Sequence, residues 1–193
     1  MKTPTEIKES NKATSFNPDW SKLLMNELRS VLWAEKAFVK AIPKILKNTS
    51  ALNLILLLEN YDPLKRKQVE RLERIFDQTD KSARGKKNNA MEALLKECDA
   101  IFSKTIYGPV RDAAIIAQMQ KMKHYAMASY GTLIMLSKMI GEEAFADVFQ
   151  NTLTELKEAD LSLSKAAFST INFDAAIDEN KFLASHYYKG KTI

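Results

Sequence analysis

Apolar side chains recur along most of this chain every three or four residues, a spacing that places them on one face of an α-helix. The first of these stripes follows Asn17 and Pro18, a capping residue and a proline at the first helical position. It predicts a helix that continues to about Asn48, with a kink at Pro43 near its end. The positions on its inward face are Leu24, Leu28, Val31, Glu35, Phe38, Ile42 and Ile45.

A second stripe predicts a helix from about Ser50 to Gln78. Because Pro63 falls in the middle of this segment, we expect a kink or a break near Asn60. The positions on the inward face of this helix are Leu57, Tyr61, Leu64, Gln68, Leu72 and Ile75.

Three more helices are expected in the second half of the chain. A polar loop leads to a short amphipathic helix from about Asn89 to Ser103. Pro109 then opens a third long helix, which ends at about Ile140 because Gly141 follows it. A fourth long helix is predicted from about Glu142 to Ser169. Its inward face carries Phe145, Phe149, Leu153, Leu156, Asp160, Leu163 and Ala167.

The composition favours an all-α fold with one domain. Of the 193 residues 46% are hydrophobic, but only five are glycine and five are proline, too few turn-forming residues for a many-stranded β protein. Four long helices and a short crossover helix predict a four-helix bundle over residues 17–171. Residues 1–16 are polar and lack periodicity, so we expect disorder there, and residues 172–193 form a C-terminal tail.

We expect a cytoplasmic protein without membrane association. The N-terminus has no apolar region of the kind found in signal peptides, and the longest apolar run, from Leu52 to Leu58, is too short to cross a bilayer. The single cysteine, Cys98, rules out an internal disulfide bond. We interpret it as a small buried apolar side chain in a reducing compartment.

Positive charge is concentrated in one stretch of the sequence. The chain has a net charge of +5, and Lys65–Lys87 contains nine basic against four acidic side chains. A basic patch of this kind is one way to bind nucleic acid. No nucleic-acid-binding motif accompanies it, so the favoured interpretation is a solvated helix end and loop.

Two of the apolar stripes contain a carboxylate. Glu35 lies within the first stripe and Asp160 within the last, and Gln68 is the polar member of the second. An unpaired buried carboxylate costs several kcal/mol, so each needs a cation, a proton or a metal ion. Inward carboxylates at mid-height of a bundle are also the ligands with which ferritin-like proteins hold two iron or manganese ions.

The number of candidate ligands is nevertheless low. The third long helix has no acid after Asp112, and in the fourth Glu155 lies one step off the inward face. His124 is on the more polar side of its helix, where a surface or hydrogen-bonded histidine is favoured over a metal ligand. The two inward carboxylates are too few for a site that binds two metal ions.

Five segments of the sequence together resemble one known family. They are "ELRSVLWAEKAFVKAIPKILKN", "QVERLERIF", "RGKKNNAMEALLKE", "VRDAAIIAQMQKMKHYAMASYGTL" and "TLTELKEADLSL". In this order, from about Ser21 to Ala167, they are similar to the ferritin-like bacterial proteins typified by YciE and YciF, a stress-linked family of unknown function. The resemblance implies a rubrerythrin-like four-helix bundle with an extra short helix, assembled as a homodimer.

This chain departs from the family pattern at the positions of inward acids. Where relatives have an acid, it has Leu64 in the second helix, Lys123 and Ala126 in the third, and Leu156 in the fourth. Three of these replacements are apolar, as a core prefers, and the lysine would repel a metal ion. The resemblance therefore implies a degenerate metal site.

Three functions remain open. The favoured one is a metal-free, non-enzymatic ferritin-like protein with a structural or interaction role. The second is a protein that binds iron or manganese with a reduced ligand set, namely Glu35, Gln68 and Asp160. The third is nucleic-acid binding through Lys65–Lys87.

The third long helix is apolar beyond a single stripe, which bears on assembly. A bundle buries one wide face of each helix, so the additional apolar positions predict either a subunit interface or cover from the C-terminal tail. They are consistent with the homodimer that the resemblance implies. The helix carries Ile115, Ile116, Met119, Met122, Tyr125, Met127, Tyr130, Ile134 and Met135.

Overall fold

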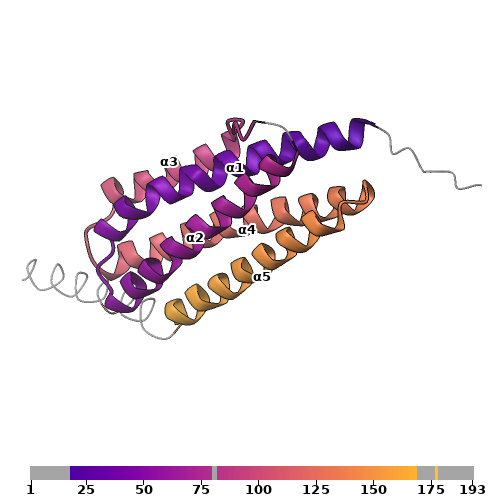
Figure 1. The fold of residues 1–193 in the computed structure, drawn as a ribbon. Helices are drawn as coiled ribbons and strands as arrows, with labels where there is room; N and C mark the ends of the chain where they lie inside the picture. Colours follow the sequence, from indigo (N-terminus) through magenta and orange to yellow (C-terminus); the bar gives the residue numbers. More distant parts are fainter. Residues whose placement is uncertain (1–17, 80–81, 169–176, 178–193) are drawn as a thin grey trace, which may run out of the picture.

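Five α-helices make up the part of the chain that the structure, a computed structural model, describes: residues 18–79, 82–168 and 177 (Figure 1). No strand occurs in these ranges, so the predicted all-α class is confirmed. Residues 1–16 and, apart from residue 177, the predicted tail at 172–193 lie outside the described part. The helices are α1 (Pro18–Lys47), α2 (Leu52–Gln78), α3 (Asn89–Lys104), α4 (Pro109–Met139) and α5 (Glu143–Ala166).

The four long helices pack in a closed ring. α1 contacts α2 and α4, and α5 contacts the same two helices from the other side, so each long helix has two long neighbours (Figure 1). Most positions of the four apolar stripes face the centre of this ring and are buried there. The shorter α3 lies outside the ring, against α1 and α4. The predicted four-helix bundle with one extra helix is therefore the observed arrangement.

α2 runs through Pro63 without a break, and the break considered near Asn60 does not occur. A proline removes one backbone hydrogen bond and crowds the preceding turn. Here Leu58 and Tyr61 are buried before the proline and Leu72 after it, so packing holds both halves in one helix. Leu64, expected on the inward face, is only partly buried.

The start of α2 is capped by a residue from α4. The N-terminal position, Ala51, has no capping side chain of its own. Instead the fully buried Asp112 accepts hydrogen bonds from the backbone N–H groups of Ser50 and Ala51, both at 2.8 Å, and from the Ser50 hydroxyl. A carboxylate at a helix N-terminus satisfies amides that lack an intrahelical partner. The beginning of α4 thus fixes where α2 begins.

α3 covers part of the additional apolar surface of α4. Met91 and Cys98 of α3 belong to the same core cluster as Ile115 and Met119 of α4. For the rest of that surface, where Met135 is exposed, a subunit interface or cover from the tail stays a prediction. Burial raises the pKa of the Cys98 thiol to about 11, in accord with its interpretation as a small core side chain.

Candidate functional site

A buried ion pair lies in the centre of the bundle. Glu35 of α1 is 2% exposed and Lys65 of α2 is 1% exposed, and their side chains are in direct contact. Lys65 occupies the inward position because it lies four residues after Tyr61 and three before Gln68, both of which are buried. The inward carboxylate of the first helix therefore has a cation supplied by the chain itself.

A chain of polar contacts continues from this pair to α5. The Lys65 ammonium donates to Gln68 Oε1 at 3.1 Å, and Gln68 Nε2 donates to Glu155 Oε2 at 2.9 Å. Arg71 closes the chain with two hydrogen bonds to the Glu155 carboxylate, at 2.8 and 2.7 Å. Partial burial raises the pKa of Glu155, but the hydrogen bonds from Arg71 and Gln68 outweigh it and lower the pKa overall.

A second lysine is buried beside the first. The Lys123 side chain of α4 is 2% exposed, and its Nζ lies 3.2 Å from the ring centroid of Tyr61. The Lys65 ammonium lies 5.8 Å from the same ring. Burial lowers the pKa of Lys123 well below its usual value, and the neighbouring Lys65 lowers it further. Within the described residues the Lys123 Nζ has no hydrogen-bond acceptor.

Two buried tyrosines lie within the electrostatic influence of the Glu35 carboxylate. Burial raises the pKa of the Tyr61 hydroxyl well above its usual value, and the Glu35 carboxylate adds to the rise. The same two causes act on Tyr130, which is fully buried and packs its ring against Phe149. Both hydroxyls therefore stay protonated at neutral pH and add no negative charge to the site.

Asp160 is not buried in the way that its apolar stripe predicts. Its side chain is 17% exposed and pairs with His124 Nε2 at 3.3 Å, on a histidine that is 65% exposed. The helix turns Asp160 toward the edge of α5, where an exposed partner is available. The interpretation of His124 as a surface histidine with a partner agrees with this geometry.

The structure thus separates the three predicted remnant ligands. Glu35 and Gln68 meet at one cation, the Lys65 ammonium, whereas Asp160 pairs with His124. Within the described residues no three His, Cys, Asp or Glu side chains gather in a metal-binding arrangement. Sequence reasoning counted Lys65 among surface charges and missed its role. Its spacing from Tyr61 and Gln68 was the available indication.

The basic stretch Lys65–Lys87 is not one continuous basic surface. Lys65 faces the core, and Arg71 is held by Glu155. Three further cations of the stretch have acidic partners on the surface: Arg66 with Asp62, Arg74 with Glu70, and Lys87 with Glu92. These pairs reduce the free positive charge on which binding to nucleic acid would depend.

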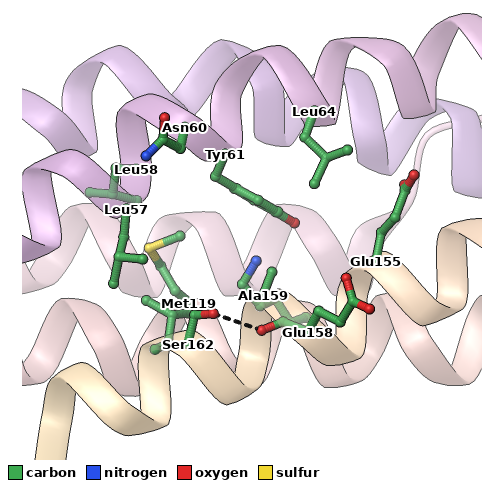
Figure 2. Close-up of a pocket in the computed structure, with 12 residues that line it drawn as sticks. Leu57, Leu58, Asn60, Tyr61, Leu64, Met119, Glu155, Glu158, Ala159 and Ser162 are labelled. Carbon is green, nitrogen blue, oxygen red and sulfur yellow. Dashed lines mark hydrogen bonds between the residues drawn. The ribbon is translucent and has the colours of Figure 1, made fainter.

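A cavity of about 220 Å³ lies between α2 and α5, next to the buried lysines (Figure 2). Its wall is mainly apolar. In Figure 2 the Tyr61 side chain extends from α2 across the space toward α5, and Glu155 and Glu158 lie along α5. Lys123 also lines this cavity. The residues that complete the lining are Leu57, Leu58, Asn60, Leu64, Met119, Ala159, Ser162 and Leu163.

Comparison with known proteins places this bundle in a family. The family described as "Domain of unknown function (DUF892)" matches residues 19–176, which include all five helices. The chain belongs to this family. Over 149 residues it is 34% identical to protein YciF of Escherichia coli (strain K12), covering 77% of this chain and 88% of that protein.

Two solved structures resemble this DUF892 chain. The crystal structure of the stress protein YciF from E. coli superposes with a TM-score of 0.75 at 30% identity, covering 79% of this chain and 97% of that one. YcfI from Rhodopseudomonas palustris, described as a candidate structural protein, gives a TM-score of 0.72 at 29% identity, covering 79% and 96%. Among the described residues, no helix of this family member is long and apolar enough to cross a membrane.

Proposed function

We propose that this chain is a metal-free, ferritin-like bundle protein with a structural or interaction role in a stress response, and not an enzyme. One observation carries the proposal: the inward Glu35 carboxylate is in contact with the buried Lys65 ammonium. A di-metal bundle site needs several carboxylates that are free to bind metal. Here the carboxylate with the most suitable position already has its counter-charge.

The charge of the surrounding groups supports this reading. The Lys65 ammonium occupies the centre of the bundle, and Arg71 holds the half-buried Glu155. A divalent ion entering this space would meet repulsion from cations in a medium that screens them poorly. The chain's own cations thus provide the positive charge that metal ions provide in a ferritin-like site.

The apolar replacements act in the same direction. Ala126 and Leu156 are buried in one core cluster, at positions where the resemblance implies acids. Well-packed apolar side chains in place of buried charges are commonly neutral or stabilising. A stable scaffold is what a structural role requires. The description of YcfI as a candidate structural protein and that of YciF as a stress protein support extending such a role to this chain.

Metal loading tests the proposal. Protein purified without a histidine tag is incubated anaerobically with Fe²⁺ or Mn²⁺ and desalted, and its metal content and thermal unfolding are measured. We expect content far below one ion per chain and an unchanged melting temperature, because only a ligand that binds the folded state raises it. Glu73→Gln removes an exposed carboxylate and controls for adventitious surface binding.

One outcome would establish the alternative, binding of iron or manganese with a reduced ligand set. It is stoichiometric metal with a raised melting temperature, both of which are lost in Glu35→Gln and kept in Glu73→Gln. The homodimer and the cytoplasmic location also belong to the proposal. A monomer mass at micromolar concentration by light scattering would remove the dimer.

A further inference from the structure

The Lys123 amine is unusual because it is buried, faces a cavity and has no polar partner. Its side chain is 2% exposed, and its Nζ lacks a hydrogen-bond acceptor among the described residues. A buried charged group without hydrogen bonds is costly, yet a methionine or leucine would fit an apolar wall without this cost. The Tyr61 ring, with its centroid 3.2 Å from this Nζ, substitutes only weakly for hydrogen bonds.

The cavity beside this amine suits a small apolar molecule. Its volume is about 220 Å³. Leucines, Met119 and Ala159 form most of the wall. Two acidic side chains, Glu155 and Glu158, also line the space (Figure 2). They disfavour an anionic occupant such as a fatty carboxylate, but they do not repel an uncharged one.

The charged groups around Lys123 favour its neutral, nucleophilic form. Burial and the adjacent Lys65 both disfavour the ammonium, and they outweigh the opposing effects of Glu35 and Asp160. A lysine in an apolar pocket next to a second cation is the setting in which lysines form Schiff bases. The ring of Tyr61 lies against the same amine, and its hydroxyl remains protonated. The cavity thus contains an amine with an available lone pair.

We propose that Lys123 binds an apolar aldehyde covalently and reversibly as a Schiff base in this cavity. The Nζ lone pair forms a bond to the carbonyl carbon while the C=O π electrons move onto oxygen, and one proton passes from nitrogen to that oxygen, giving a carbinolamine. Loss of the hydroxyl group and of a proton from nitrogen as water then forms the imine. The step is a condensation without oxidant or reductant, and water reverses it. The alkyl chain of the aldehyde lies against the leucine wall.

This site goes beyond the structural role proposed above and does not depend on it. Metal loading and amine labelling measure different groups, so either proposal can fail while the other stands. Lys65 provides an internal comparison, because it is equally buried but pairs with Glu35 and does not line the cavity. The exposed Lys121, two residues away on the same helix, provides the second.

Reductive labelling tests the proposal. The native full-length protein is incubated with hexanal at neutral pH, imines are reduced with sodium cyanoborohydride, and modified lysines are located by peptide mass spectrometry. We expect Lys123 to be labelled faster than Lys121 by roughly tenfold or more, since each unit of pKa changes the neutral amine fraction tenfold. Lys65 should remain unmodified.

Two variants separate the chemistry from folding. Lys123→Met should lose this label and keep the slow labelling of surface lysines. Ala159→Leu fills the cavity and leaves the amine in place, so it should slow labelling of Lys123 severalfold while Lys121 is unchanged. It also provides a test if Lys123→Met does not fold.

Two results would overturn the proposal. One is labelling of surface lysines with Lys123 modified only in denaturant, which would mean that aldehydes do not reach the amine. The other is equal protection against thermal unfolding by hexanal and by hexanoate without a covalent adduct at Lys123. That result would assign the cavity to reversible, non-covalent binding of apolar chains.

Discussion

The buried pair of Glu35 and Lys65 allows a quantitative test of the core. In Lys65→Met the methionine fills a similar volume, but the Glu35 carboxylate is left in an apolar centre without its cation. Both partners are almost completely buried, at 2% and 1% exposure, so water cannot replace the missing charge. Gln68 Oε1 also loses the donor that lies at 3.1 Å.

The expected loss is large. Removing one member of a buried pair costs about 3–5 kcal/mol of unfolding free energy because the remaining charge is unpaired. The double variant Glu35→Met, Lys65→Met removes both charges and should regain most of this loss. The matched control is Lys36→Met, which removes an exposed pair with Glu73; surface pairs contribute about 0–1 kcal/mol.

Urea denaturation, followed by the circular dichroism of the helices, measures the unfolding free energy of all four proteins. The values can be compared directly when the slope of free energy against urea concentration is the same in each. We expect the order wild type, Lys36→Met, the double variant and then Lys65→Met, from most to least stable. If Lys65→Met lowered the unfolding free energy by less than about 1 kcal/mol, the range for surface pairs, water would have access to the pair. The account of the site as a buried counter-charge would then be wrong.

The other predictions concern backbone space, the capping carboxylate and pH. Gly131→Ala should raise the unfolding free energy by about 0.5–1 kcal/mol, because nothing lies within 4 Å of the added methyl group. In Gly85→Ala the added methyl group would lie 3.1 Å from Trp33 Cβ, and the unfolding free energy should fall by about 1–3 kcal/mol. Asp112→Ala leaves the Ser50 and Ala51 amides at the start of α2 without their acceptor and should cost about 2 kcal/mol or more, which urea denaturation measures in all three variants. The folded state lowers the pKa of Lys123, so it binds that proton less strongly than the unfolded chain; wild-type stability should therefore rise with pH up to about 10.4, the unfolded pKa. A stability profile of Lys123→Met with the same slope as wild type in this range would contradict this cause.

The helices could be predicted from the sequence because their boundaries depend on local chemistry. Pro18 and Pro109 begin α1 and α4, where a proline at the first position loses no hydrogen bond. The break considered at Pro63 does not occur because the effect of a proline depends on packing from other helices, which a single segment does not contain. The position of α3 against α4 has the same origin, since apolar periodicity identifies a buried face but not the partner that buries it.

The site was predicted in part. Glu35 and Gln68 were identified because a polar side chain in an apolar stripe requires a partner. Lys65 was not identified, because the predicted inward face of the second helix includes Leu64 instead. A shift of one residue turns a side chain by about 100° around a helix with 3.6 residues per turn. The sequence also cannot show that the cation for an acid in the first helix comes from the second.

The cap that Asp112 provides to α2 has a consequence for how the two halves of the chain unfold. The Ser50 and Ala51 amides have a hydrogen-bond acceptor only while a residue 62 and 61 positions later in the sequence is in place. Deuterium should therefore enter these amides only in openings that also separate α4 from α2. We expect these two amides, just before α2, to exchange with the same free energy as the core of α4, as parts of one cooperative unit.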